Sequence, residues 1–591
     1  MSPLLWVLAC EKNDPPQPAV TTDTVPSIDG VVPLSDIAQL NRASMAIRGI
    51  RPSLSDISLI QSDPAQLEAL VDAWLDSPEF SETIKDMYAE LLLLRTDVAY
   101  QLPQKGILTD KGITQGDIHH STVESPLIFI ADIIMNDRSY TEVFTADYMW
   151  SNDVLADIYG LEYNFEGPEW QQSHWTDGRP QSGLLSDSEM WRRHVSNAAN
   201  YHRGRANFVS KTFLCSDIAG RDVEVGQGID LADPEEVANA VSTNTTCVGC
   251  HDVLDPLAAN WWGYKEQLQR NAVDQAYVAG CTFDITVDEE VRGVYRPEHF
   301  CYPLRFYDVE EQGRWEDELL KPPGFYGTPT EDMTDVGRLL VDDPRFSQCT
   351  AVSWFAYLAE VEREAIPLDV AMKYQTVLED ANFDIKTLIA EIVLDPTFMA
   401  DRVEAGSAAY VTGLRIIRPE QLDRTLADLT GFQWLANEDD ADCAEGTDLC
   451  WETVNLSRSD LTGFRSMMGG VDGYTVTHPT HSPTPTKVLA MARLAADAAG
   501  WAVETDFLLP IGGRKLFNDI ELVDASEVSV RAQIAALHTR VLGIPAAADD
   551  ATVDLLYTTL FLPVLASGGD AEEAWKLTLS GLLQDPAMMF W

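Results

Sequence analysis

Apolar residues recur along the chain mainly at the three- and four-residue spacing of helices, and only rarely in the alternation of strands. In residues 67–75, for example, the apolar positions share one helical face, and Asp76-Ser77-Pro78 then ends the helix. We therefore expect a mainly α fold. The same spacing predicts further helices over residues 127–135, 154–159, 388–393, 488–499, 553–565 and 575–583.

The main exception to this helical pattern lies between Cys281 and Cys301. Residues 283–287 alternate between apolar and polar side chains, as a strand does. We expect a small irregular or β insertion near residues 280–330, set into an otherwise multi-domain helical scaffold.

A short pattern of Asp or Ser followed by Pro and a large apolar residue ends four predicted helices. It occurs near residues 76, 342, 395 and 585. Asp and Ser cap the following helix, and Pro suits its first turn. A common helix–turn–helix corner explains the pattern. The alternative is an internal duplication, in which residues 417–422 open the second half as residues 34–40 open the first.

Composition and charge narrow the class of protein. The chain has 591 residues, of which 45% are hydrophobic, which excludes a disordered or collagen-like chain. Lys and Arg number 41 against 94 Asp and Glu, giving a net charge of −53. Such a charge repels a phosphate backbone, so we expect no nucleic-acid partner. Apolar runs after the first residues are far shorter than the roughly 20 that span a membrane, so we expect no transmembrane helix.

The N-terminal segment has the pattern of a lipoprotein signal. Residues 2–10 form a short apolar run ending in Leu8-Ala9-Cys10, and a Pro-rich polar stretch follows. We predict a signal peptide over residues 1–9, with Cys10 as the lipid anchor and a flexible linker over residues 10–33. The run lacks basic residues and is short, so a frayed apolar terminus is the alternative. The prediction implies export to the periplasm or cell surface.

The most specific motif is Cys247-Val248-Gly249-Cys250-His251, which has the spacing that attaches haem c. Two thiols at this spacing add across the two vinyl groups of one porphyrin, and the adjacent histidine binds the iron. A zinc site would need a second Cys or His pair at matching spacing, and a thioredoxin-like pair would need a βαβ context. We predict one covalent haem c per chain, held by Cys247, Cys250 and His251.

Six cysteines remain after Cys10 and the haem pair, and this even number allows three disulfides. Cys443 and Cys450 are close in a polar loop, and Cys281 and Cys301 flank a short segment. This leaves Cys215 to pair with Cys349, although other connectivities stay open. Disulfides and haem c both indicate an oxidising compartment outside the cytoplasm.

The sixth iron ligand decides between electron transfer and substrate chemistry. We predict His202, with His194, Met190 or an open position as alternatives. Arg203 and Arg205 are candidates for pairing with the haem propionates, since a guanidinium matches a carboxylate in two-point contact.

Other residues have weaker signals. Trp261, Trp262 and Tyr264 can pack on a porphyrin or simply fill a core. Two histidine pairs could bind a metal, and an acidic loop over residues 437–448 could bind calcium, although all three are more typical of ordinary surface. The histidine pairs are His119 with His120, and His478 with His481.

Several segments together resemble a family of large exported bacterial proteins with planctomycete-type cytochrome c domains, mostly of unknown function. The resemblance covers most of residues 35–400 and, more weakly, residues 410–591. It implies an exported monohaem protein but no reaction. Residues 260–264 depart from the usual acidic-aromatic run after the haem motif. The segments that carry the resemblance are residues 40–80, 136–160, 182–215, 247–257 and 343–398.

From these observations we expect an exported c-type cytochrome-like protein that transfers electrons to or from an unknown redox partner. One alternative is a haem-dependent oxidoreductase with an open distal site. The other is a surface binding or structural protein in which haem acts only as a structural staple that stabilises the core. Beyond residue 33, the expected units are an N-terminal helical domain (34–118), a haem-bearing helical domain (119–270), a disulfide-containing insertion (271–330), a helical domain (331–405) and a C-terminal helical domain that is a possible repeat of the first (406–591).

Overall fold

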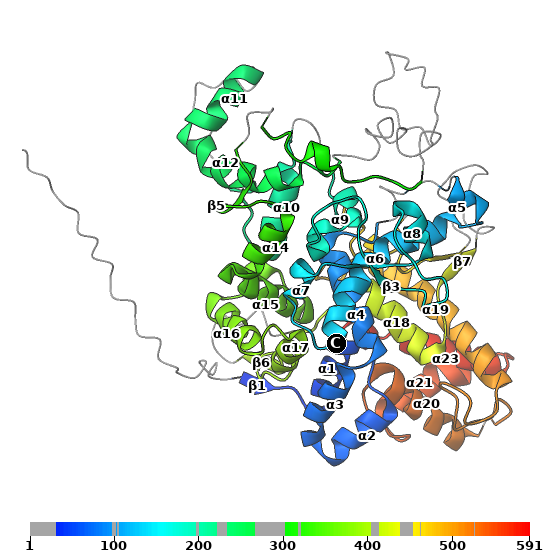
Figure 1. The fold of residues 1–591 in the computed structure, drawn as a ribbon. Coiled ribbons are helices and arrows are strands. Elements are labelled where there is room, and N and C mark those ends of the chain that lie inside the picture. The colour runs from blue at the N-terminus through cyan, green and yellow to red at the C-terminus, as the bar shows by residue number, and fades with distance from the viewer. Residues whose placement is uncertain are drawn as a thin grey trace, which may run out of the picture.

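The computed structural model is mainly helical, with a few two-stranded pairings (Figure 1). None of the described helices is long and apolar enough to cross a membrane. The structure describes residues 31–591 except for 97–101, 103, 105, 197–199, 222–232, 266–301, 317–320, 404–412, 438–452, 461–462 and 525.

The first part of the chain forms a bundle that begins with strand β1. Its elements are β1 (Val31–Pro33), α1 (Asp36–Arg48), α2 (Leu54–Ser62), α3 (Leu67–Trp74), α4 (Pro78–Leu92), α5 (Ile107–Asp110), α6 (Gln115–Met135), α7 (Glu142–Thr145), β2 (Met149–Ser151), α8 (Asp153–Tyr159) and β3 (Gln171–Ser173).

The haem motif lies in the next part, where α11 and α12 stand at one edge of the molecule (Figure 1). The elements here are α9 (Ser188–Arg193), α10 (Arg203–Phe213), α11 (Pro234–Thr243), α12 (Thr245–Ala258), β4 (Gly324–Phe325), β5 (Thr328–Pro329), α14 (Met333–Val341), α15 (Pro344–Ala359), α16 (Leu368–Asp380), α17 (Ile385–Val393) and β6 (Ala400–Val403).

The last part packs long helix α19 against α23. Its elements are α18 (Pro419–Thr430), β7 (Leu435–Asn437), β8 (Thr453–Asn455), α19 (Pro485–Leu508), α20 (Glu527–Leu542), α21 (Ala551–Leu556), a π-helical turn (Tyr557–Phe561), α22 (Leu562–Ala566), α23 (Ala571–Leu583) and α24 (Pro586–Met589).

Helical periodicity predicted these elements well. The predicted helix at 67–75 is α3, and those at 154–159 and 388–393 are α8 and α17. The predictions at 127–135 and 488–499 identified parts of the longer helices α6 and α19. Three of the four Asp/Ser-Pro corners are also confirmed; after Asp395-Pro396 the chain makes a turn into strand β6 instead of a helix. Ser77, Asp343 and Asp585 each cap the helix whose first residue is the following proline.

The insertion near residues 280–330 is described only in part, and residues 283–287 with both cysteines of the predicted Cys281–Cys301 disulfide lie outside the described residues. Within the insertion, β4 and β5 form a short antiparallel pair. The predicted Cys443–Cys450 disulfide and most of the acidic loop also lie outside the described residues. The predicted domain boundary at residues 118 and 119 falls inside α6, so this helix joins two predicted domains.

Helix α1 holds the early and late parts of the chain together. Strand β1 pairs antiparallel with β6. The Arg42 Nη1 donates to the carbonyl oxygens of Phe398 at 3.0 Å and Ala400 at 2.8 Å. The Asn41 amide donates to the Gly543 carbonyl at 2.7 Å. These buried bonds join the N-terminal helices to two later predicted domains, within one continuous core.

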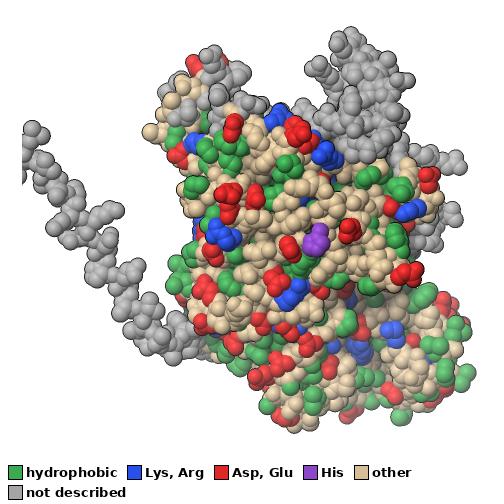
Figure 2. All heavy atoms as spheres, in the orientation of Figure 1, with side chains coloured by type: hydrophobic (Ala, Val, Ile, Leu, Met, Phe, Trp, Pro, Cys, Tyr) green, Lys and Arg blue, Asp and Glu red, His purple; other side chains and the backbone are tan. Residues whose placement is uncertain are grey.

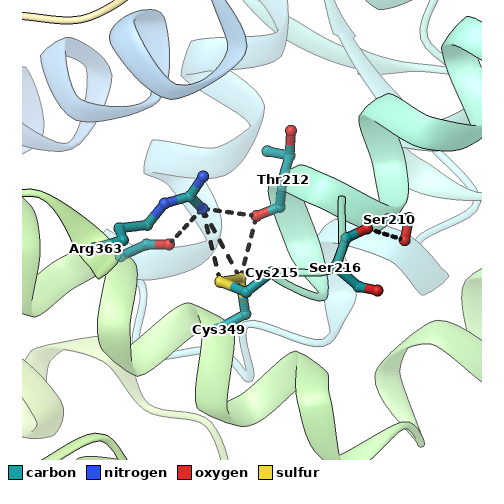
Figure 3. Close-up of a disulfide and its surroundings, with 7 residues drawn as sticks. Ser210, Thr212, Cys215, Ser216, Cys349 and Arg363 are labelled. Atoms are coloured by element: carbon teal, nitrogen blue, oxygen red, sulfur yellow. Dashed lines mark hydrogen bonds between the residues drawn. A yellow bond between two sulfur atoms is a disulfide. The ribbon is translucent and has the colours of Figure 1, made fainter. Parts of the chain in front are cut away.

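The predicted Cys215–Cys349 disulfide is confirmed. It joins the end of α10 to α15, with 5.4 Å between the two Cα atoms and 134 residues between the cysteines in sequence. The Arg363 guanidinium lies against both sulfurs, with Nη1 3.8 Å from Cys215 Sγ and 3.9 Å from Cys349 Sγ (Figure 3). The disulfide therefore fixes α10, which packs against the haem-motif helix α12, to α15.

Candidate haem-attachment site

Helix α12 presents the two cysteines of the motif from one side. Cys247 and Cys250 are three residues apart, which places them on neighbouring turns of the same helical face. Both thiols are unpaired and half-buried. The Cys250 Sγ lies 3.8 Å from the Ile218 carbonyl oxygen, so this face of α12 is directed toward the segment that follows α10.

His251 is oriented by a buried carboxylate one helical turn further along α12. Its Nδ1 lies 2.9 Å from Asp255 Oδ1, and the Nε of Arg203 donates to the same oxygen at 2.6 Å. Burial alone would raise the pKa of Asp255, but the hydrogen bonds from His251 and Arg203 outweigh it and lower the pKa below its usual range. The carboxylate is therefore ionised and holds the imidazole in one orientation.

This arrangement fits a covalent haem c. A metal-binding histidine commonly donates its other ring N–H to a carboxylate, which fixes its tautomer and makes it a stronger ligand. With Nδ1 bonded to Asp255, the His251 nitrogen left to bind iron is Nε2, which makes no hydrogen bond to the described part of the chain. The two free thiols and this oriented imidazole supply the donors that the group needs.

His202 lies close to this site but is differently engaged. It is buried, its backbone is left-handed with a φ of 61°, and its ring edge packs on Trp262. Burial holds its pKa well below the usual range, so the ring is neutral. Arg205 Nη1, which can only donate, lies 3.1 Å from Nδ1. Nδ1 therefore accepts and Nε2 carries the proton, the opposite of the His251 arrangement.

The two arginines predicted beside the haem have different positions. Arg203 reaches the site through Asp255. Arg205 is fully buried, and its guanidinium bonds within the protein. Besides His202, it donates to the carbonyl oxygens of His194 at 2.9 Å, Trp191 at 3.0 Å and Lys265 at 2.7 Å. Arg205 therefore ties the start of α10 to the backbone around it, whereas Arg203 is the arginine that lies next to the haem motif.

The other candidate ligands and aromatic residues belong to packed surroundings. The His194 ring stacks on Phe208 with 3.6 Å between centroids, and its Nε2 lies 2.9 Å from the Leu92 carbonyl oxygen. Burial lowers its pKa to about 3. The remaining candidates are all buried, and the three aromatic ones pack on other rings of the core: Met190, Trp261, Trp262 and Tyr264.

The two histidine pairs that were weighed as weak metal-site candidates lie on other elements than the haem motif. His119 and His120 are neighbours in α6, and His120 packs edge-on against Trp170. His478 and His481 line a cleft in the middle of the molecule. Among the residues that the structure describes, no three His, Cys, Asp or Glu side chains are grouped to hold a metal ion.

Sequence reasoning identified Cys247, Cys250 and His251 but missed Asp255. Its position four residues after His251, on a segment with helical periodicity, is a signal that could have revealed it. The sequence has no comparable signal for the His202–Arg205 hydrogen bond. The i, i+3 spacing of the two residues does not show which ring nitrogen of the histidine the guanidinium contacts.

Comparison with known proteins gives one family match. Residues 59–161 match the model of the family PSD4, described as a protein of unknown function (DUF1592). This family is found in planctomycete-type cytochrome c proteins of unknown function, which supports the resemblance loosely. The matched segment runs from α2 to α8 and does not include the haem motif. Neither the curated proteins nor the solved structures contain a match to the chain.

Proposed function

We propose that this protein is an exported monohaem c-type cytochrome-like protein that exchanges single electrons with a partner protein. The observation that carries the proposal is the pairing of two unpaired thiols on one face of α12 with an imidazole oriented by Asp255. A bound haem c would supply reversible one-electron transfer at this site.

The protein's own residues would hold and tune that group. Cys247 and Cys250 would attach it, and His251 Nε2 would bind the iron. The Asp255 carboxylate would make His251 a stronger electron donor to the iron. Arg203, which bonds the same carboxylate oxygen, would partly offset its negative charge. The Cys215–Cys349 disulfide and the N-terminal pattern support export, with Cys10 as the proposed lipid anchor.

One observation favours a second candidate, a haem-dependent oxidoreductase with an open distal position. The proton on His202 Nε2 leaves no lone pair there for iron while Arg205 occupies Nδ1. Ligation by His202 would require that contact to break. If it does not break, and no other side chain takes its place, the sixth position stays open to a small substrate.

The visible spectrum tests these candidates. Electron transfer predicts a low-spin spectrum, reversible one-electron reduction and no cyanide binding. If His202 is the sixth ligand, His202→Ala turns the spectrum high-spin and opens the iron to cyanide. An unchanged low-spin spectrum in this variant places the ligand elsewhere. A high-spin wild type that binds cyanide contradicts the electron-transfer proposal and favours the oxidoreductase.

The role of Asp255 gives a further prediction. In Asp255→Asn the charge beside His251 is lost, so the midpoint potential should rise, by an amount on the order of tens of millivolts, because the oxidised iron loses a stabilising negative charge. Spectroelectrochemical titration measures this potential. Asp252→Asn is the matched control, because Asp252 lies on the same helix, is exposed and pairs with Lys321 instead. Equal potentials for the two variants would contradict the role.

A further inference from the structure

A cleft of about 390 Å³ lies between α4, α10, α15 and the loop after residue 473, away from the haem motif. This volume lies within the usual range for sites of small organic molecules. Its wall includes apolar and aromatic side chains, among them Leu91, Phe208 and Tyr357. Four segments that are distant in sequence meet here, so no local sequence motif predicts the cleft.

Arg363 places a positive charge in this cleft, and no carboxylate forms a close ion pair with it among the described residues. Its Nη1 contacts only neutral groups: the Thr212 carbonyl oxygen and Ser353 Oγ, each at 3.4 Å, and the two disulfide sulfurs (Figure 3). Glu364 and Glu362 flank it in sequence, line the same cleft and interact with its charge at longer range, but neither forms a close ion pair with it among the described residues. Arg42 likewise hydrogen-bonds only to carbonyl oxygens, but it does not line this cleft.

The other basic side chains that line the cleft are held by closer contacts: Arg193 Nε donates to the Leu93 carbonyl oxygen at 2.6 Å, whereas Arg418 and Lys211 pair with acidic side chains. Arg418 pairs with Glu90 and, at 2.6 Å, with the buried Glu360. Lys211 pairs with Asp217 at 3.0 Å. Carboxylates on the face shown in Figure 2 are spread widely among fewer basic side chains, as the net charge requires. Arg363 therefore stands out as the cation that an incoming anion can pair with.

A second polar group, the imidazole of His481, lines the same cleft with each ring nitrogen near a carboxylate. The His481 Nδ1 is buried and has no hydrogen-bond partner among the described residues, although Glu360 Oε2 lies 3.4 Å away. Its Nε2 lies 3.5 Å from Oε1 of Glu362, the residue before Arg363. His481 and Arg363 therefore line the same cleft, where a ligand can contact both.

We propose that this cleft binds a small organic carboxylate, with Arg363 pairing with the carboxylate group, His481 bonding a second polar atom and the aromatic wall covering the apolar body. The site is separate from the haem motif but linked to it, because α10 contributes Phe208 and Lys211 to the cleft and Arg203 to the haem motif. At about 1.5 Å per residue, Arg203 and Lys211 are roughly 12 Å apart along the helix.

Calorimetric titration of the full chain at low ionic strength tests the proposal, with benzoate as the probe and benzamide as its neutral match. Benzoate should bind one to one and at least tenfold more tightly than benzamide. Arg363→Gln should weaken benzoate binding at least tenfold without changing benzamide binding. Arg338→Gln is the control, because Arg338 is an exposed arginine of α14 outside the cleft, and it should leave both unchanged.

A second measurement keeps the test valid if Arg363→Gln fails to fold. Benzoate should protect Arg363 of the wild-type protein from phenylglyoxal, while Arg338 is modified equally with and without benzoate. The proposal is overturned if benzoate does not bind, if benzamide binds equally well, or if Arg363 is not protected. Repeating the titration with Cys247→Ser/Cys250→Ser separates this result from the haem proposal, because the cleft does not use either thiol.

Discussion

Acid–acetone extraction should leave the porphyrin attached to the wild-type protein and remove it completely from the Cys247→Ser/Cys250→Ser variant. Two thioether bonds survive conditions that release a haem held only by its iron ligand and by packing. The double variant keeps His251 and Asp255, so it can still bind haem, but only non-covalently. Absorbance of the protein after extraction measures the attached fraction, in material produced in an oxidising compartment that attaches haem c.

The single variants sharpen this test. Cys247→Ser and Cys250→Ser should each keep one thioether and therefore resist extraction in part. His251→Ala should retain the thioethers but lose the axial ligand, which shifts the spectrum without releasing the porphyrin. Release of all porphyrin from the wild-type protein would contradict covalent attachment, and with it the proposed function.

Loss of the Cys215–Cys349 disulfide should destabilise the protein by several kcal/mol. The bond closes a loop of 134 residues, for which the loss of chain entropy in the unfolded state is worth about 5 kcal/mol. Urea denaturation of Cys215→Ser/Cys349→Ser measures the change in the free energy of unfolding. Ser216→Ala is the matched control, since it alters the neighbouring residue and leaves the bond intact. A change below about 1 kcal/mol would show that the bond adds little to the folded state.

The helices could be predicted from the sequence because their signals are local. The Asp/Ser-Pro corners place a cap and a suitable first residue side by side, and the caps at Ser77 and Asp343 follow directly. Helix α19 was predicted too short. Its buried face continues from Ala499 to Ala502, while Trp501 between them is about half exposed, which interrupts the simple pattern.

The candidate site could be predicted only where covalent chemistry fixes the spacing. Haem attachment demands two thiols and a histidine in five residues, so Cys247, Cys250 and His251 were recognisable. The disulfide followed from subtraction of the other cysteines. Arg205 could not be assigned in the same way, because its acceptors are mostly backbone carbonyl oxygens, which every residue carries. The sequence does not show which carbonyl groups surround a buried guanidinium.

The cleft lined by Arg363 and His481 could not be predicted from the sequence for a related reason. Glu360 and His481 are 121 residues apart, and no periodic pattern connects them. The sequence suggested His478 and His481 only as a weak metal-site candidate, because both lie in one Pro- and Thr-rich loop. Their surroundings instead place them with Arg363 and an aromatic wall, which changes the class of ligand that we expect.

The contacts of helix α1 impose an order on biosynthesis. The long-range partners of Asn41 and Arg42 are Gly543 and, for Arg42, residues 398–400 and Gly413, and the Arg51 guanidinium bonds the carbonyl oxygen of Phe590. These groups stay exposed to water until nearly the whole chain has been made, and contacts of such long sequence separation form slowly. A nascent or truncated chain therefore keeps its first helices open to chaperones and proteases, and only the finished chain can close them.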